Sequence, residues 1–345
     1  MILVLSIFPL VASLTLSVTN LVFQKGRIDL TFVGLTNYTT LLFGTERSHF
    51  LGVLRGPSPL GWAVVAVAAV LIGRLSWTTI RGQRRSVFGV AVRVVAAVLA
   101  VGFVYLFVQT LFSDGGRPGA LFVTIMFVVV GIALQYVIGL GLAYLAVQPL
   151  AGRRFFRIAF LLPLTITPVG VGYMFKMMTD TSKGPLEPVF LALGLRNFTW
   201  VTDPWLARLA VVIGDTWQWT PFVFIVLLAA LEAQDHEILE AAWVDGAGRL
   251  QSFLRITLPQ ILPVSATVVL IRLIEGFKII DMPNILLGGG PGTATQSLTL
   301  EAYLDWRTLN LGRSAAIAYL LLIIVTVAAT AYVALVRRRV AQEPA

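Results

Sequence analysis

The stretch EAAWVDGAGRLQSFLRITLPQILP, residues 240–263, is a polar interval in an otherwise apolar chain, and the organisation of the fold follows from it. Its two adjacent alanines are small enough to let another protein approach the backbone closely. Asp245 can cap the helix that follows, and Gly246 permits a turn that a residue with a Cβ resists. Apolar residues then recur at roughly helical spacing until Pro259, which predicts the end of this helix. The stretch therefore predicts two short helices joined by a sharp turn.

Composition places most of the chain in a membrane. Of its 345 residues, 57% are hydrophobic and only 12% are charged, with a mean hydropathy of +0.87, whereas soluble domains carry about 25% charged residues. The absence of cysteine excludes disulfides, thiolate metal sites and cysteine nucleophiles. His49 and His236 are far apart in the sequence, so neither a metal nor a cofactor is expected. The net charge of +9 is attributed to arginine beside membrane spans, and no nucleic-acid partner is expected.

Eight apolar segments are interpreted as transmembrane helices, which predicts an all-α polytopic membrane protein. They lie at about 2–23, 60–75, 87–112, 121–147, 157–178, 205–231, 261–282 and 313–336. Prolines in the segment 157–178 predict a kink there. Arginine clusters at 81–85, 153–157 and 337–339 predict that both termini and the loop 232–260 are cytoplasmic.

The opening stretch resembles the cytoplasmic EAA loop in the permease subunits of binding-protein-dependent ABC importers. The matching positions are Glu240, Ala241, Ala242, Asp245, Gly246, Ala247, Ile256, Leu258 and Pro259. Residues 32–38, FVGLTNY, resemble the segment after the first helix of sugar-type permeases, and residues 212–336 resemble the C-terminal core of maltose-type permeases. The resemblance covers about residues 5–45 and 119–336, which is most of the chain.

The family plan has six helices, whereas the sequence predicts about eight. The resemblance therefore implies a six-helix type I importer core with an inserted helical hairpin. The implied parts are a first helix and outer loop at 1–46, the hairpin at 47–118, and the permease core at 119–345.

The resemblance also implies a function, that of a non-catalytic subunit forming half of a pathway for a mono- or oligosaccharide in the bacterial inner membrane. Its implied partners are a second homologous permease, two ATP-binding subunits, an external solute-binding protein that delivers the sugar, and membrane lipid. The residues implied to couple to the ATPase are Glu240, Ala241, Ala242, Asp245, Gly246, Ala247 and Gly248. The sequence has no G-x-x-x-x-G-K-[ST] motif, so ATP hydrolysis must take place in a partner chain.

Four charged residues lie in the predicted helix 261–282 at spacings of three. They are Arg272, Glu275, Lys278 and Asp281. This spacing puts neighbours on one helix face, where alternating charges can pair as a ladder. Ionisable groups inside a span are also functional candidates, so direct contact with a polyhydroxyl substrate is the alternative.

A second polar group lies on the predicted helix 205–231, where Asp215 is close to Trp217 and Trp219. Aromatic rings beside a few polar groups suit a sugar pocket, although tryptophans can equally anchor a helix at the membrane interface. The maltose-type resemblance implies a substrate pathway lined by Asp215, Trp219, Phe222, Arg272, Glu275, Gly276 and Ile279.

Other functions stay open on the sequence alone. Within the importer class, the cargo could be glycerol-phosphate, a polyol or another small solute. An ion-coupled secondary carrier would explain charges inside the membrane, but it would not explain the EAA pattern and often shows inverted repeats. A membrane-embedded enzyme would need a polar catalytic cluster outside the EAA stretch, and none stands out.

Overall fold

The computed structural model describes residues 2–24, 27–53, 56–81, 117–149, 152–180, 183–194 and 199–340, with scattered positions between 97 and 109. The chain divides into two compact units, Met1–Phe32 with Thr124–Ala345, and Val33–Val123. Most of the predicted helix 87–112 lies outside the described residues.

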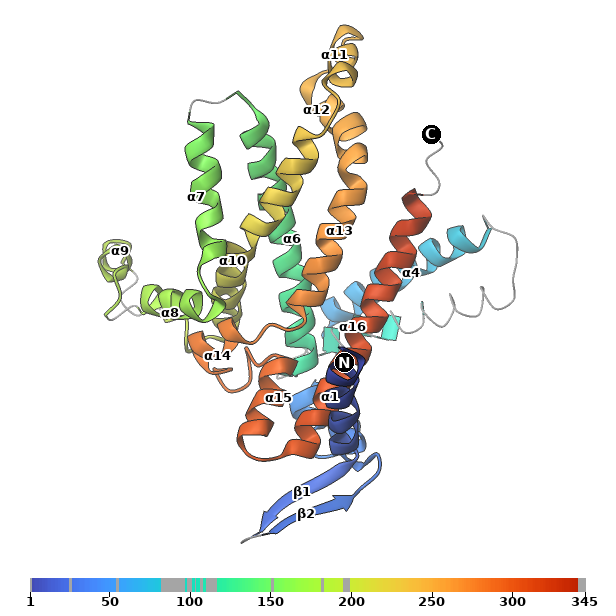
Figure 1. The fold of residues 1–345 in the computed structure, drawn as a ribbon, viewed down its shortest axis with the longest axis vertical. Helices are drawn as coiled ribbons and strands as arrows, with labels where there is room; N and C mark the ends of the chain where they lie inside the picture. Colours follow the sequence, from blue (N-terminus) through green and yellow to red (C-terminus); the bar gives the residue numbers. More distant parts are fainter. Residues whose placement is uncertain are drawn as a thin grey trace. The chain divides into compact units, whose positions relative to one another are not determined.

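Helices that could cross a membrane dominate the larger unit (Figure 1). Among the described residues, four are long and apolar enough: α6 (Ala120–Val147), α10 (Pro204–Glu232), the continuous helix Arg249–Gly276, and α16 (Leu311–Val340). A fifth span is possible if a bent pair of helices is counted as one. The helical membrane class is therefore confirmed, and these helices supply four or five of the eight predicted spans.

The bent pair consists of α7 (Arg153–Thr165) and α8 (Pro168–Thr179), which meet at an angle of 99°. The residue before a proline is pushed out of the helical region, and Thr167 is accordingly extended, with ψ 147°. Its hydroxyl accepts a hydrogen bond from the Gly170 N–H at 3.2 Å and caps α8. The predicted kink is thus a complete break, because one helix ends and a second, capped helix begins.

The core of the larger unit lies where α6, α10 and α13 (Leu258–Gly276) meet. Gly139 of α6 allows a close approach, since a Cβ there would lie 2.9 Å from Cγ1 of Val223 on α10. Small residues of this kind let helices pack tightly in lipid. The buried residues of this core are Ala143, Ala146, Val223, Phe224, Leu227, Leu228, Leu231, Ile261 and Val268. The three helices are therefore held in a fixed register.

The predicted helix end at Pro259 is wrong. α12 (Arg249–Ser252) continues through a π-helical turn at Phe253–Thr257 directly into α13. A proline inside an α-helix removes one hydrogen bond and clashes with the carbonyl four residues earlier. The wider π turn just before Pro259 changes that local geometry, so the proline ring is accommodated. One unbroken helix of 28 residues results.

The predicted helix 261–282 is too long at its other end. α13 stops at Gly276, and Asp281 begins a separate helix, α14 (Asp281–Leu287). The segments that follow the predicted spans 157–178 and 261–282 also contain short helices, α9 (Glu187–Ala192) and α15 (Leu298–Arg307). Ser297 starts α15 by accepting a hydrogen bond from the Leu300 N–H at 3.1 Å.

The predicted first span, 2–23, is also too long. α1 (Ile2–Ser17) gives way to an antiparallel ribbon of β1 (Thr19–Gln24) and β2 (Arg27–Phe32). Polar and apolar residues alternate along β2, which is the period of a strand and not of a helix. The pairing of β1 with this alternating strand accounts for residues 19–24, which the apolar composition had placed in the helix.

The smaller unit contains α2 (Thr36–Leu42), α3 (Arg47–Phe50) and α4 (Pro59–Arg81), so the segment between the first two predicted spans is partly helical. β3 (Gly52–Val53) pairs with β4 (Arg117–Pro118). Gly52 has φ +102°, and a Cβ there would lie 2.3 Å from the Arg117 carbonyl oxygen, so this ribbon requires glycine.

Candidate functional site

The EAA stretch forms a helical extension at one end of the larger unit, where α11 (His236–Val244) and α12 lie in Figure 1. Gly246 follows α11 with φ +83°, a left-handed conformation that favours glycine, so the predicted turn is confirmed. The predicted cap by Asp245 is wrong. Gly248 occupies the N-cap position of the next helix, whereas the Asp245 N–H donates back to the Ala241 carbonyl at 3.0 Å. The turn leaves Asp245 at the end of α11, three residues short of that N-cap position.

The surface of this extension is exposed and partly apolar. Glu240 and Ala241 are exposed, while Ala242 is buried. Val244, just before the turn, is 87% exposed. Other exposed apolar side chains on the extension are Ile238 and Leu250. A group of exposed apolar residues with a polar rim is typical of a protein contact surface.

The base of the extension is tied to the membrane helices. Gln234 follows α10, and its Nε2 donates to the Thr257 carbonyl at 3.1 Å and to Gln260 Oε1 at 3.0 Å. A cavity of about 530 Å³ lies beneath the turn and is lined by residues of α6, α10 and the extension, including Gly248. The extension is thus anchored at its base and open beneath its turn.

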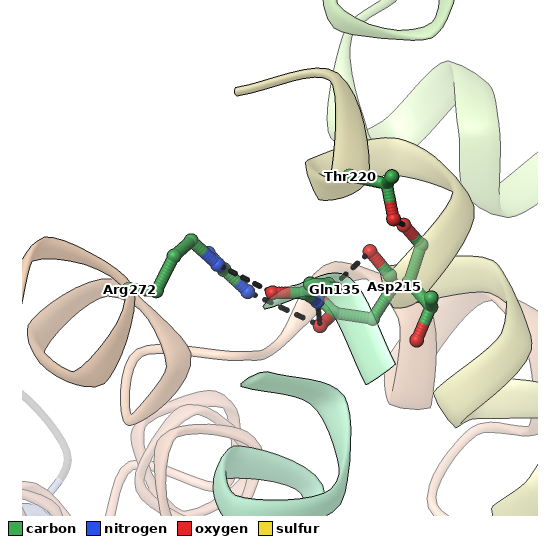
Figure 2. Close-up of polar contacts among 5 residues, drawn as sticks. Gln135, Asp215, Thr220 and Arg272 are labelled. Carbon is green, nitrogen blue, oxygen red and sulfur yellow. Dashed lines mark hydrogen bonds and ion pairs between the residues drawn. The ribbon is translucent and has the colours of Figure 1, made fainter. Parts of the chain in front are cut away.

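A buried polar cluster connects three membrane helices some distance from this loop (Figure 2). Gln135 of α6 donates from Nε2 to Asp215 Oδ2 of α10 at 2.8 Å. Arg272 of α13 donates from Nε to Gln135 Oε1 at 2.8 Å and from Nη2 to Asp215 Oδ2 at 3.2 Å. Each of the three side chains therefore contacts the other two.

This cluster is an ion pair almost without solvent, since Arg272 is only 2% exposed. A buried ion pair must recover a large desolvation cost through good geometry and further hydrogen bonds. Gln135 supplies those bonds, because its amide donates to Asp215 and its carbonyl accepts from Arg272. Gly131, one turn earlier on α6, leaves room for the carboxylate: a Cβ there would lie 3.3 Å from Asp215 Oδ2. The cluster is thus specific to this packing of the three helices.

An aromatic pair extends the cluster along α10. The Cζ atom of Arg272 lies 4.3 Å from the ring centroid of Trp219, a cation–π distance. The Trp219 and Phe222 rings follow edge to face, with centroids 6.5 Å apart. Both aromatic residues are half-buried. The structure therefore brings together four of the residues that the sequence analysis assigned to a substrate pathway: Asp215, Trp219, Phe222 and Arg272.

The remaining three predicted pathway residues, Glu275, Gly276 and Ile279, have other surroundings. Glu275 pairs with Lys278 at 2.7 Å. Gly276 is buried, and a Cβ there would lie 3.4 Å from Val128 of α6. Ile279 is half-buried after the end of α13, and its carbonyl accepts a hydrogen bond from the Ser297 hydroxyl at 2.6 Å.

The predicted ladder of four charges along one helix face is wrong. Arg272 makes its hydrogen bonds to other helices, and only Glu275 and Lys278 pair with each other. α13 ends before Asp281, so the spacing of three no longer places that residue on the same face. Burial raises the pKa of the Asp281 carboxyl above its usual value.

Sequence reasoning did not assign Gln135 to the site. The available signal was an amide in the middle of an apolar helix, where an unsatisfied polar group is costly. Its partners are 80 and 137 residues away in the chain, so the sequence could not identify them. Among the residues that the structure describes, no group of three or more His, Asp or Glu side chains could hold a metal ion.

Comparison with known families matches residues 135–341 to the binding-protein-dependent transport system inner membrane component. The chain belongs to this family: it is the permease subunit of a binding-protein-dependent ABC importer, a multi-pass inner-membrane component and not an enzyme. The resemblance seen in residues 240–263 is thereby confirmed. The alternatives of an ion-coupled carrier and a membrane enzyme are not supported.

Individual relatives support the same class. The trehalose/maltose transport system permease of Thermococcus litoralis is 33% identical over 204 residues, covering 59% of this chain and 69% of the relative. The trehalose transport system permease of Mycobacterium tuberculosis is 29% identical over 290 residues, covering 81% and 86%. A chain of a bacterial ABC transporter for the polysaccharide alginate matches with a TM-score of 0.58 at 24% identity, covering 64% and 78%. This last likeness shows that the fold is that of an ABC importer permease.

Proposed function

We propose that this chain forms half of the translocation pathway for a sugar, a mono- or oligosaccharide, in an ATP-driven importer. Relatives named for trehalose or maltose transport support a sugar as the cargo, and they make trehalose and maltose the first sugars to try. The site supports the same class of cargo, because a half-buried Trp219 and Phe222 beside polar groups suit a sugar ring.

A second, homologous permease would complete the pathway, and two ATPase subunits would dock on the two EAA loops. A solute-binding protein would deliver the sugar from outside, and the solved alginate transporter in complex with an alginate pentasaccharide-bound periplasmic protein supports such a partner. With the EAA loop in the cytoplasm, both termini of this chain lie on that side of the bacterial inner membrane. In this proposal the coupling residues are Glu240, Ala241, Ala242, Asp245, Gly246, Ala247 and Gly248.

The observation that carries the proposal is the continuous helix Arg249–Gly276. It starts at the EAA turn and includes Arg272 of the buried cluster, about 35 Å away at the rise of an α-helix. A rigid helix moves as a unit, so displacement of the loop by the ATPases would be transmitted to the cluster. Transport then requires that nucleotide and sugar favour different arrangements of the helices.

The substrate pathway in this proposal follows one side of α10 and α13. Trp219 and Phe222 would contact the sugar ring, and Glu275 would bind hydroxyl groups beside Ile279. Asp215, Arg272 and Gly276 are buried, and they would shape the pathway from behind. The inserted hairpin predicted at 47–118 has no assigned part in this pathway.

The first test is purification of the detergent-solubilised chain, with mass spectrometry of the proteins that accompany it. We expect a second permease and an ATPase, and we expect ATP hydrolysis in proteoliposomes to rise when a binding protein loaded with trehalose or maltose is added. A chain that purifies alone and transports without ATP would contradict the proposal.

A substitution pair tests the coupling role of the loop. Ala241→Leu enlarges an exposed position on α11 that the proposal places against the ATPase, so it should abolish co-purification of that subunit. Arg255→Ala changes an exposed residue in the π turn, outside the coupling set, and should leave the complex intact. Equal recovery of the ATPase with both variants would contradict docking through α11.

A further inference from the structure

The guanidinium of Arg272 is held in place from three directions. Nε is bound to Gln135, Nη2 is bound to Asp215, and the plane lies over the ring of Trp219. The residue is almost completely buried. A guanidinium held in this way packs against the Trp219 ring, and its burial keeps it out of contact with a solute.

Gln135 is the residue that completes this support (Figure 2). Its Oε1 accepts from Arg272 while its Nε2 donates to the Asp215 carboxylate and, at 3.3 Å, to the Asp215 backbone carbonyl. A glutamine side chain offers a donor and an acceptor together without adding charge. A carboxylate at this position would lack the donor, and an apolar side chain would lack both. The orientation of Arg272 therefore depends on an amide at position 135.

We propose that Gln135 is a positioning residue for the sugar site, which holds the Trp219 indole in its orientation through Arg272. This inference rests on the proposed function, because it requires that the exposed part of Trp219 faces the sugar. The guanidinium covers one face of the indole, and Phe222 meets the ring nearly at a right angle. The orientation of the indole therefore decides which surface a sugar ring can stack on.

The experiment compares Gln135→Leu with Tyr136→Phe in the complete, purified transporter. Tyr136 is a matched control because its hydroxyl also makes a hydrogen bond from α6 to α13, to Ser265 Oγ at 3.0 Å. It lies outside the cluster, so both variants remove contacts between the same two helices but only one removes the support of Trp219.

The first measurement follows the ring itself and needs no sugar. Trp residues are labelled with 5-fluorotryptophan, and the fluorine resonance of Trp219 is assigned as the one that Trp219→Phe removes. Gln135→Leu should shift or broaden this resonance, whereas Tyr136→Phe should leave it unchanged. An unchanged resonance in Gln135→Leu, or equal shifts in both variants, overturns the proposal.

The second measurement is equilibrium binding of radiolabelled trehalose to the same preparations. Gln135→Leu should weaken binding roughly ten-fold, the scale expected for losing hydrogen bonds to charged groups, and Tyr136→Phe should leave binding unchanged. If the wild type binds neither trehalose nor maltose, the proposed cargo fails, while the fluorine signal still decides the role of Gln135. A moved resonance with unchanged sugar affinity overturns the link between Gln135 and the sugar.

An exchange of side chains provides the rescue. Gln135→Glu alone adds a carboxylate beside Asp215, and Asp215→Asn alone leaves Arg272 without its anion, so each should move the Trp219 resonance. Combined, they keep one carboxylate, one amide and one guanidinium, and should return the resonance toward the wild-type position. No recovery in the double variant contradicts the cluster as the cause. If Gln135→Leu does not fold, Gln135→Asn replaces it, since it keeps the amide but shortens its reach.

Discussion

The continuous helix Arg249–Gly276 begins beside the EAA turn and carries Arg272 of the buried cluster, yet the turn and the cluster are stabilised in opposite ways. The loop depends on local conformation: Gly246 is exposed, and a Cβ there would meet nothing within 4 Å. The cluster depends on distant contacts, since its three side chains come from α6, α10 and α13. A change in the loop should therefore affect coupling to partners, whereas a change in the cluster should affect the stability of the chain.

The largest expected effect is the loss of Arg272. Arg272→Leu leaves the Asp215 carboxylate buried without its cation, which should cost about 3–5 kcal/mol of unfolding free energy. Arg208→Leu is the matched control, because Arg208 is also buried and lies over a tryptophan ring, that of Trp205, but its Nε donates to the neutral carbonyl of Ala294, at 2.8 Å, and not to a carboxylate. Reversible unfolding in mixed micelles measures both variants.

The same comparison has an internal check. Adding Asp215→Asn to Arg272→Leu removes the unpaired charge and should recover part of the lost stability. Equal costs for Arg272→Leu and Arg208→Leu would show that the buried ion pair contributes no more to stability than the contacts of Arg208.

A smaller effect is expected where α6 meets α10, one turn from Gln135. The Cβ added by Gly139→Ala would lie 2.9 Å from Val223 and 3.2 Å from the Phe224 backbone nitrogen, so overpacking should cost about 1–3 kcal/mol. On the same helix, the Cβ added by Gly141→Ala meets nothing within 4 Å. Gly141→Ala should leave the unfolding free energy unchanged or raise it slightly, because alanine is more favourable than glycine in a helix. Unfolding curves that coincide for the two variants would rule out close packing at Gly139.

The loop should respond in coupling and much less in stability. Gly246→Ala places a Cβ in a left-handed conformation, with a strain of about 1–2 kcal/mol confined to the turn. We expect less sugar transported per ATP hydrolysed, with little change in the unfolding of the membrane helices. Gly288→Ala imposes the same kind of strain after α14, at φ +59° and also in open space, away from the EAA loop. If Gly246→Ala and Gly288→Ala lower the amount of sugar transported per ATP equally, backbone strain alone explains the effect, and the EAA turn has no special part in coupling.

The smallest effect is expected from the exposed pair Glu275–Lys278. Removing its cation with Lys278→Met should change the unfolding free energy by about 0.5 kcal/mol or less, since exposed pairs contribute little. The affinity for trehalose distinguishes the roles of the two residues. If Glu275 contacts sugar hydroxyls, Glu275→Gln should lower this affinity more than Lys278→Met does. Equal and negligible effects would remove Glu275 from the pathway.

The sequence by itself determined the class of protein and the EAA turn. Apolar composition identifies membrane helices, because lipid requires long apolar segments. The residues 240–263 identify the family, and a glycine at 246 is a local requirement that can be read without the fold. The breaks after Ser17 and Gly276 were missed because apolar composition extends beyond them into a ribbon and a second helix.

Only the tertiary structure decided how the charged residues are used. Spacing predicted that Arg272 pairs along its own helix, but packing at Gly139 and Gly131 brings α6 and α10 close enough for Gln135 and Asp215 to bind it instead. The π turn likewise lets Pro259 lie inside a continuous helix, which local rules do not predict. The partners of Arg272 depend on where distant segments meet, and that information is absent from any single stretch of the chain.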